Sequence, residues 1–463
     1  MTELLEPTPD PWTAEDGHIE LREELERAVV RALDFKQDEI ARELVKGLHY
    51  ADLADLIERL SPEDRDDLIE ILGDDLPANA IAELDEAVRD DVFDEFDTGE
   101  LAEVVSELDT DDAVMVVEEL EEHEKKEILE AIPEEDRTLI EEALSYPEDS
   151  AGRMMQREFV AAPEFWTVGE TIEYVRSGTK LPDRFFNIFV IDPAHHPLGV
   201  VPLSQLLRST LDVKLSDLMQ ASLKTVPAEA DQEEVAFLFR QRDLVSAPVV
   251  GAGGRMVGVI TVDDVVDVID EEHEEDIMRL GGVKEDDLYD SVIDTTKARF
   301  AWLLINLGTA IAASIVIGLF DATIEQIVAL AVLMPIVASM GGNAGTQTLT
   351  VAVRALAMKE VSSTNALRII GKELAVGGIN GIVFAILAGA AAWLWFESGA
   401  LALVIAAAMV INLLVAGLAG AAIPLALERM KIDPAVASSV FLTTITDVVG
   451  FFAFLGLAAL FLL

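Results

Sequence analysis

The stretch Leu442–Phe452, LTTITDVVGFF, places one carboxylate in an apolar run that extends from about Val436 to Leu463. An apolar run of this length is typical of a membrane-spanning helix. An ionised carboxylate at the centre of such a helix costs about 2.5–3.5 kcal/mol. The side chain of Asp447 is therefore either protonated and hydrogen-bonded inside a helix bundle, or it faces a partner charge, a polar cavity or a cation. Because intramembrane carboxylates usually have functional roles, the cation-binding interpretation is favoured.

A second membrane stretch, MPIVASMGGNAGTQTLTVAVRALA, combines helix-breaking residues with side-chain oxygens. Pro335, Gly341-Gly342 and Gly345 predict an interrupted helix, which is tolerated at membrane depth if it is buried in protein or lines a cavity. There its free carbonyls can hold a cation or its water shell. Small residues also permit close helix packing, and this alternative explains the glycines equally well. It does not explain the polar side chains among them, which are Asn343, Thr346, Gln347, Thr348 and Thr350.

These oxygen ligands suit a hard cation. Mg²⁺ dehydrates reluctantly and binds through one or two carboxylates while it keeps several waters. One Asp447 per chain is few for a divalent-cation pore, so we expect a dimer axis to double it. The chain has no cysteine, which excludes disulfides and thiolate metal sites. We find no nucleophile–base arrangement, P-loop or His-rich metal motif, so we do not expect an enzyme.

Charge divides the chain into two halves. Acids and bases balance from Lys297 onward, so the net charge of −53 belongs to the first 296 residues. An anionic surface of this kind repels nucleic acid and attracts cations. A surface adapted to a saline habitat is the alternative, and the sequence leaves it open. The acidic start, MTELLEPTPDPW, lacks the apolar core of a signal peptide, so we expect the acidic half to stay in the cytoplasm.

The acidic half begins with a segment, 1–17, that we predict to be disordered. Residues 18–146 show helical periodicity throughout, for example at Leu53, Leu56, Ile57 and Leu60. Short helices begin with a capping residue followed by acids, as in Ser61-Pro62-Glu63-Asp64. Repeated short helices of this kind stack into a superhelix, so we predict an all-α superhelical N-terminal domain.

Two similar segments follow, 147–212 and 213–270, and each predicts the order strand, helix, strand, strand, helix. The pairs FNIFVIDPAHHPLGVVPLSQLL and SAPVVGAGGRMVGVITVDDVVDVI carry the likeness. This repeat resembles a tandem pair of α+β CBS modules, which usually act as regulatory sensors and often bind adenosine ligands. Thr261 and Asp263 are spaced like the ribose-contacting pair of nucleotide-binding modules, which leaves ATP open as a ligand. A helix N-cap at Thr261 explains the same pair at least as well.

Residues 271–299 predict an acidic connecting helix that Gly281-Gly282 breaks or bends. Residues 300–463 hold five candidate spans. Every basic residue of this half falls on the side of the acidic half, which predicts a cytoplasmic N-terminus and an external C-terminus. The expected spans are about Phe300–Phe320, Ile324–Met358, Ile369–Phe396, Ala400–Leu427 and Ala435–Leu463.

The order of acidic helical domain, CBS pair, connecting helix and five spans resembles the MgtE magnesium channel family. The motifs GGNAGTQT (Gly341–Thr348) and TDVVG (Thr446–Gly450) carry the resemblance. It implies a multidomain, homodimeric membrane protein that imports Mg²⁺ across the inner (plasma) membrane, in contact with lipid, through one pore lined by the second and fifth spans. Asp447 then binds the permeating hydrated ion, and the neighbouring filter positions are Thr346, Thr350, Ser439 and Thr443, with Asn343 beside them.

The resemblance also implies a gate. Cytosolic Mg²⁺ binds between carboxylates of the helical domain, CBS pair and connecting helix, and the connecting (plug) helices then close the pore. Matching gives two sets of candidates, Glu83 and Asp111 in the helical domain and Asp264, Asp267, Glu272, Glu275 and Asp276 around the connector. Repulsion among like charges gives the same behaviour without any resemblance, since the acidic half opens without cation and compacts with it.

Two other functions stay open. A cation/proton exchanger would use Asp447 as a proton carrier, and its uptake would collapse with the pH gradient. A membrane-anchored nucleotide sensor would use its spans only to dimerise and would show no ion flux. Selectivity among Mg²⁺, Mn²⁺, Co²⁺ and Ni²⁺ does not follow from the sequence, because all accept octahedral shells of oxygen and water.

Overall fold

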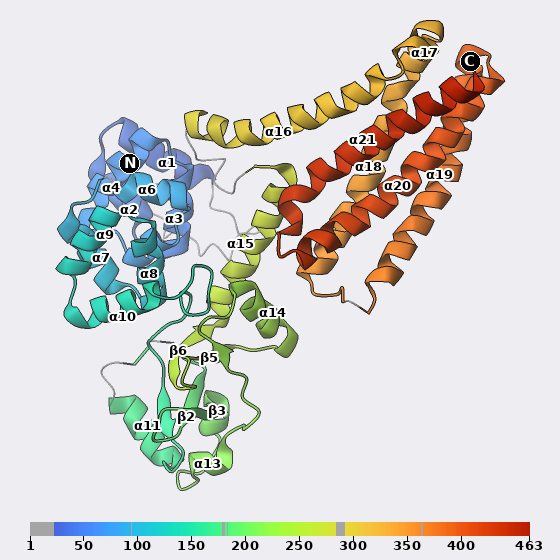
Figure 1. Cartoon of the computed structure of the whole chain (residues 1–463). Coiled ribbons are helices and arrows are strands. Elements are labelled where there is room, and N and C mark those ends of the chain that lie inside the picture. The colour runs from blue at the N-terminus through green and yellow to red at the C-terminus, as the bar shows by residue number, and fades with distance from the viewer. Residues whose placement is uncertain (1–22, 94, 178–180, 183, 284–291, 363) are drawn as a thin grey trace. The chain divides into compact units, whose positions relative to one another are not determined.

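The computed structural model describes residues 23–93, 95–177, 181–182, 184–283, 292–362 and 364–463. The chain divides into two compact units, Met1–Glu271 and Glu272–Leu463. The first unit holds short helices and two small sheets, and the second holds long apolar helices (Figure 1). The segment 1–17, predicted to be disordered, lies outside the described residues.

The N-terminal part of the first unit is all-α. Ser61 accepts a hydrogen bond from the Asp64 N–H at the start of its helix, and Asp97 and Glu100 form a capping box. Helices two apart in sequence pack together, as α3 does on α5 and α5 on α7, which confirms the superhelix. The helices are α1 (Glu23–Asp34), α2 (Asp38–Val45), α3 (Tyr50–Arg59), α4 (Pro62–Leu72), the 3₁₀ helix η2 (Gly73–Asp75), α5 (Ala78–Ala82), α6 (Glu86–Phe93), α7 (Thr98–Glu107), α8 (Thr110–Glu119), α9 (Glu122–Ala131) and α10 (Glu134–Leu144).

Two three-stranded sheets follow, and they share one topology. In each, the first strand pairs parallel with the second and the second pairs antiparallel with the third. This confirms the predicted repeat. The elements are β1 (Ala161–Pro163), α11 (Val168–Ser177), β2 (Asn187–Ile191), β3 (Pro197–Pro202), α12 (Leu203–Leu206), α13 (Leu215–Leu218), β4 (Val226–Pro227), α14 (Gln232–Arg242), β5 (Ser246–Val250), β6 (Met256–Thr261) and α15 (Val262–Gly281).

Polar contacts join the helical part of the first unit to the sheets. The Thr110 hydroxyl donates to Glu158 at 2.7 Å, and Arg153 forms an ion pair with Glu118. The Arg153 side chain also donates to the carbonyls of Leu144 and Tyr146. These contacts hold the N-terminus of α8 next to the start of α15, where the acidic residues considered below lie.

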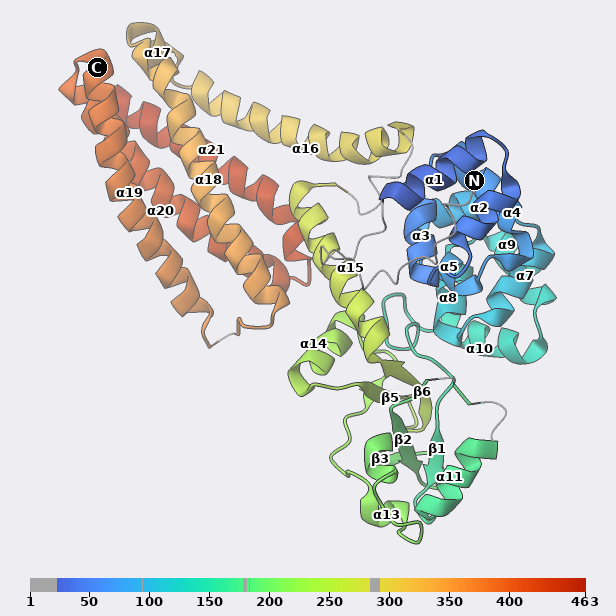
Figure 2. The same ribbon diagram turned by 180° about the vertical axis from the view of Figure 1, so that it is seen from behind.

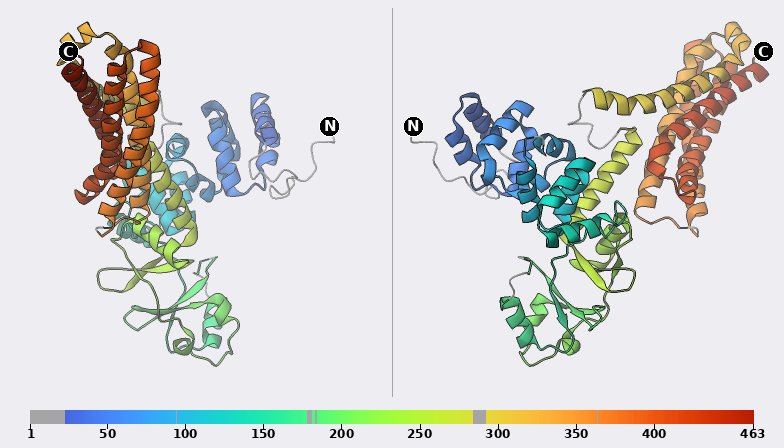
Figure 3. Two further views of the ribbon diagram at one scale, coloured as in Figure 1. Left: turned by 90° about the vertical axis from the view of Figure 1, so that its right-hand side faces the viewer. Right: turned by 60° about the vertical axis from the view of Figure 1, so that its left-hand side comes forward.

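Among the described residues of the second unit, five helices are long and apolar enough to span a membrane. They are α16 (Val292–Gly318), α18 (Ala329–Ala357), α19 (Ala366–Phe396), α20 (Gly399–Arg429) and α21 (Pro434–Phe461), and α17 (Asp321–Gln326) is a short helix between the first two. Helix α20 packs against α18, α19 and α21 (Figure 2). The C-terminal part of α16 contacts α21. The N-terminal half of α16 projects away from the other long helices (Figure 3).

Two expectations about the second span were wrong. The span begins at Ala329 rather than Ile324, because Asp321–Gln326 forms the separate helix α17. Helix α18 is also continuous, although an interruption was predicted. Pro335 lies within its first two turns and removes one backbone hydrogen bond without ending the helix. Gly341 and Gly345 lie in close contact with Asn412 of α20 and Leu442 of α21, so close packing explains these two glycines.

Candidate functional site

One face of α21 carries the intramembrane carboxylate. Ser439, Thr443 and Asp447 follow one another at four-residue spacing, so they lie along one side of the helix. Thr443 is exposed, and Ser439 and Asp447 are half-buried. The Asp447 side chain has no hydrogen bond or ion pair with any residue that the structure describes. It is thus a half-buried carboxylate, unpaired among the described residues, in the middle of a candidate membrane-spanning helix.

A matching polar face lies on α18. Asn343, Thr346 and Thr350 are exposed and lie at helical spacing. The hydroxyls of Thr346 and Thr350 donate to the carbonyls of Gly342 and Thr346, each at 3.0 Å. Thr443 on α21 does the same toward the Ser439 carbonyl at 2.7 Å. Because each hydroxyl proton is directed at the backbone, the oxygen lone pairs remain available to the water shell of a cation.

The two polar faces belong to helices that pack together, since Leu442 of α21 lies directly against Gly345 of α18. We call Asn343, Thr346, Thr350, Ser439, Thr443 and Asp447 the polar stripes. Thr348 does not belong to them, because it is buried and donates to Glu373 at 3.3 Å. Polar side chains at membrane depth are costly against lipid, so the stripes require a second protein surface or water.

Sequence reasoning missed Asn412, which joins the helices that carry the stripes. It is fully buried in α20, and its side-chain N–H donates to the Val337 carbonyl of α18 at 2.8 Å. Gly341 of α18 and Gly450 of α21 both lie against its amide. Both glycines belong to the two motifs singled out in the sequence. An Asn within an apolar span was the available signal.

We expect Gly450→Ala to reduce transport strongly, because the added Cβ would lie 2.8 Å from the Asn412 amide nitrogen. The double variant Gly450→Ala/Asn412→Ala restores room and should recover part of the loss, which a double-mutant cycle of uptake rates measures. Gly371→Ala is the control, since a Cβ there meets nothing within 4 Å. Equal loss in the single and double variants would contradict the proposed contact.

The first unit gathers carboxylates where the N-terminus of α8 meets the start of α15. We call Glu83, Asp111, Asp112, Asp264 and Asp267 the acidic cluster. Glu83 follows α5, Asp111 and Asp112 lie in the first turn of α8, and the other two lie at the start of α15. Thus four residues predicted from sequence come together, and Asp112 joins them. Asp112 was not predicted, although its position beside Asp111 in the same acidic helix turn indicated it.

Burial and mutual repulsion raise the pKa values of this cluster. Burial, then Asp264 and Asp112, raise the pKa of Asp111 well above its usual range. Burial, with Asp109, Glu83 and Asp267, raises the pKa of Asp112 to about 6. Burial, with Asp263 and Asp112, raises the pKa of Asp264 to about 7. The pKa values of Glu83 and Asp267 are also raised, chiefly by burial.

One oxygen of the cluster is suited to a cation. The Asp111 Oδ1 atom is buried and has no hydrogen-bond partner among the described residues. A buried carboxylate oxygen without a partner is costly unless a proton or cation neutralises it. The nearby Arg89 donates from Nη1 to both carboxylate oxygens of Glu119, at 2.8 and 2.9 Å. Oxygen donors of this kind fit Mg²⁺, which binds few carboxylates directly and keeps several waters.

A second set of acids lies at the end of α15, in the second unit. Arg279 pairs with Glu275 and with Asp433, which caps α21. Burial, then Asp433 and Glu272, raise the pKa of Asp276. Leu280 packs against buried residues of α18, α20 and α21, including Leu349 and Leu442. Asp433 was not predicted, although an Asp before Pro at a helix start is a typical cap.

Thr261 and Asp263 contact each other at the start of α15. Asp264 accepts from the Thr261 N–H at 3.2 Å and from its hydroxyl at 3.0 Å, and the hydroxyl also contacts Asp263. The bond from the Thr261 N–H to Asp264 is one half of a capping box, but the Thr261 hydroxyl donates rather than accepts, so the N-cap at Thr261 stays a prediction. The hydroxyl proton is already donated to the carboxylates of its own helix start, so the pair alone provides no evidence for a nucleotide.

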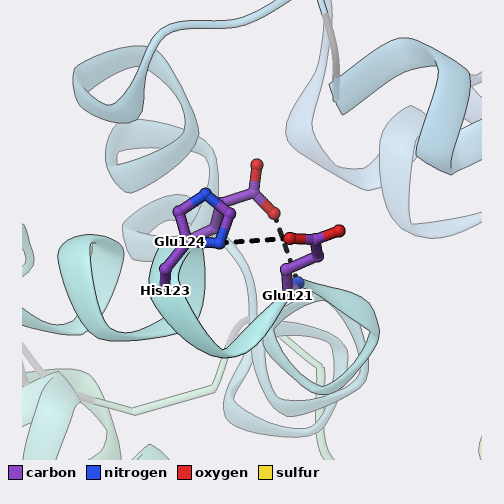
Figure 4. A group of neighbouring side chains, drawn as sticks. All are labelled: Glu121, His123 and Glu124. Atoms are coloured by element: carbon purple, nitrogen blue, oxygen red, sulfur yellow. Dashed lines mark hydrogen bonds and ion pairs between the residues drawn. The ribbon is translucent and has the colours of Figure 1, made fainter.

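In the described ranges, one group of three or more His, Asp or Glu side chains has ligand atoms within 4.8 Å of one another. It is Glu121, His123 and Glu124 (Figure 4). Glu121 and Glu124 form the capping box of α9, and His123 lies 3.2 Å from the Glu121 carboxylate. Glu121 and His123 are exposed, and capping accounts for the group. Three carboxylates of the acidic cluster do not approach this closely.

Comparison with known proteins gives a consistent result along the chain. Residues 334–457 match the MgtE divalent cation transporter model, 48–149 the MgtE intracellular N domain and 215–271 the CBS domain. The magnesium transporter MgtE of Thermus thermophilus is 34% identical over 325 residues, which are 69% of this chain and 72% of that protein. The chain belongs to the MgtE family. The Bacillus subtilis magnesium transporter MgtE is 31% identical over 69% of this chain and 71% of its own length.

Two solved structures are similar to part of this MgtE chain. The soluble part of a magnesium transporter is 27% identical, with a TM-score of 0.48, and the match covers 54% of this chain and 98% of that one. The cytosolic domain of the Mg²⁺ channel MgtE in complex with ATP is 28% identical, with a TM-score of 0.49, over 52% of this chain and 99% of that one.

The MgtE family models cover the residues described above. The transporter model, 334–457, includes both polar stripes, Asn412 and Gly450. The N-domain model, 48–149, includes Glu83, Asp111 and Asp112. The CBS model, 215–271, includes Asp264 and Asp267 at its end. The family match therefore includes both the stripes and the acidic cluster.

Proposed function

We propose that this MgtE chain is a Mg²⁺-selective channel that imports Mg²⁺ across the inner (plasma) membrane. One observation carries the proposal: Asp447 is a half-buried carboxylate on a polar stripe of a candidate membrane-spanning helix, and no described residue pairs with it. A hydrated Mg²⁺ binds such a carboxylate through its water shell, and the stripe hydroxyls accept hydrogen bonds from those waters. The magnesium transporters that the chain resembles support the identity of the ion.

The channel functions as a homodimer in this proposal. In a single chain, Asn343, Thr346 and Thr350 face outward from α18 at membrane depth. Contact with lipid is unfavourable for these polar side chains. A second copy related by a twofold axis instead encloses a polar path between the stripes. Two Asp447 carboxylates then face one path, which matches the charge of a divalent cation.

Cytosolic Mg²⁺ closes the channel. The acidic cluster repels itself without cation, and Mg²⁺ bound there draws the helical part and the start of α15 together. Glu272, Glu275 and Asp276 sense the ion at the other end of the same helix. Leu280 lies against residues of α18 and α21, so a shift of α15 reaches the helices that carry the stripes. The positions of the basic residues among the spans support a cytosolic acidic half and an external C-terminus.

The experiment is uptake into liposomes that contain the purified full-length protein and a Mg²⁺ indicator. We expect uptake down a Mg²⁺ gradient that persists when an ionophore removes the pH gradient, and that falls when Mg²⁺ is raised on the side of the acidic half. Uptake that stops with the pH gradient would favour the cation/proton exchanger. Absence of flux, together with tight nucleotide binding, would favour the membrane-anchored sensor, and the same preparation tests ATP as a second ligand.

A further inference from the structure

A cavity of about 290 Å³ lies between α18 and α19, at the end of the bundle where the loop from Met358 to Asn365 joins them. A single ordered water needs only about 10–15 Å³ of such volume, so the cavity can hold a group of several atoms. Gly417 and Gly420 of α20 lie against Glu373 and Thr348, two residues of its lining. The cavity is lined by Thr348, Val351, Ala352, Ala355, Glu360, Asn365, Arg368, Ile369, Lys372 and Glu373.

Charges of both signs face this cavity and balance. Arg368 and Lys372 lie one helical turn apart on α19. Glu373 is buried, accepts from Thr348 at 3.3 Å and lies 3.4 Å from the Lys372 ammonium. The side chains of Arg368 and Glu360 have no hydrogen bond or ion pair with the described residues. One free cation and one free anion therefore border the same cavity, beside a pair that neutralises itself.

The charges are ordered along the axis of the bundle. Glu360 belongs to the loop, Arg368 to the first turn of α19, and Lys372 to the next turn. Val351, which is exposed on α18, and Ile369 add apolar walls. A phospholipid presents the same order, with its amine outermost, its phosphate next and its chains toward the membrane centre.

We propose that this cavity binds the headgroup of an aminophospholipid such as phosphatidylethanolamine. Its phosphate contacts Arg368 and Lys372, and its ammonium donates to the Glu360 carboxylate. Three alternatives fit less well. A divalent cation would be repelled by the two bases, phosphatidylglycerol offers Glu360 only neutral hydroxyl donors and no cation, and phosphatidylcholine has no N–H to donate. The lipid site is tested by binding, whereas the proposed channel is tested by ion flux. Either proposal can therefore fail without the other.

Native mass spectrometry of the full-length protein tests this proposal after equilibration with equal amounts of phosphatidylethanolamine, phosphatidylcholine and phosphatidylglycerol. We expect phosphatidylethanolamine to be retained over phosphatidylcholine by about three- to tenfold, which corresponds to one hydrogen bond. Glu360→Gln keeps the shape but removes the charge, and should bring that ratio close to one. Arg368→Gln should lower retention of all three lipids.

Two further variants guard against a folding artefact. Arg429→Gln removes a base from the same end of the bundle outside the cavity, and should leave retention unchanged. Ala355→Phe fills the cavity without altering its charges, and should lower retention of all three lipids. Preferential retention of phosphatidylglycerol, a preference that survives Glu360→Gln, or full retention in Ala355→Phe would each overturn the proposal.

Discussion

Asp447→Asn is expected to reduce Mg²⁺ flux by at least about 100-fold, because one unit charge about 4 Å from a divalent cation is worth several kcal/mol at intermediate dielectric constant. The substitution keeps the size of the side chain and removes only its charge. Since no described residue pairs with this carboxylate, no partner is left unpaired by the change. The rate of indicator-reported uptake in liposomes measures the loss.

A pair of adjacent threonines provides the control for this variant. Thr443 and Thr444 both donate to backbone carbonyls of the preceding turn, at 2.7 and 2.6 Å, but only Thr443 belongs to the stripe. We expect Thr443→Val to slow uptake and Thr444→Val to leave it close to wild type. Wild-type flux in Asp447→Asn, or equal effects of the two Val variants, would refute the assignment of the stripes.

The second large effect concerns the acidic cluster. We expect Asp111→Asn/Asp264→Asn to remove the response of both conformation and flux to cytosolic Mg²⁺. Asp264 repels Asp111, and Asp112 repels both, so neutralising Asp111 and Asp264 removes both repulsion and cation ligands. Limited proteolysis of the full-length protein at pH 8 measures conformation. Mg²⁺ should slow cleavage of the wild type and should leave the cleavage rate of the double variant unchanged.

The pH dependence follows from the same pKa shifts. Burial raises the pKa of Asp112 to about 6 and that of Asp264 to about 7 in the folded state, whereas an unfolded Asp titrates near about 3.9. Protonation therefore stabilises the packed cluster fully below about pH 4, and this stabilisation is lost as the pH rises through about 7. Without Mg²⁺, the wild type should be cleaved more slowly at pH 5.5 than at pH 8.

Asp67→Asn/Glu70→Gln is the matched control, because it removes two exposed charges from α4 outside the cluster. It should keep the wild-type responses to both Mg²⁺ and pH. If Mg²⁺ protects the Asp111→Asn/Asp264→Asn variant as well as the wild type, the cluster is not the sensor.

Helix type and order could be predicted because they depend on local patterns. The caps at Ser61 and Asp97, the strand–helix repeat and the apolar spans all follow from neighbouring residues, and the structure has them. The break in α18 was predicted wrongly for a related reason. Sequence patterns treat Pro and Gly as helix breakers. In the structure, Gly341 and Gly345 instead make room for side chains of α20 and α21 that pack against them.

The missed site residues depend on contacts distant in sequence. Asn412 is significant because two glycines from other helices meet it, and Asp433 because Arg279 reaches it from α15. Neither contact leaves a local pattern. The spacing of Asn343, Thr346 and Thr350 does leave one, and their common face follows directly from helical periodicity. Which side of each helix meets the bundle required the packed structure.

In the proposed channel, the side chain at position 447 faces water within the membrane. The chain has no cysteine, so Asp447→Cys introduces a single thiol. We predict that a charged, membrane-impermeant thiosulfonate modifies this thiol in lipid bilayers and that Mg²⁺ slows the reaction, while Ile386→Cys on the exposed face of α19 resists the reagent. Modification of the Asp447→Cys variant only by lipophilic reagents, at a rate that Mg²⁺ does not change, would contradict a cation path past this residue.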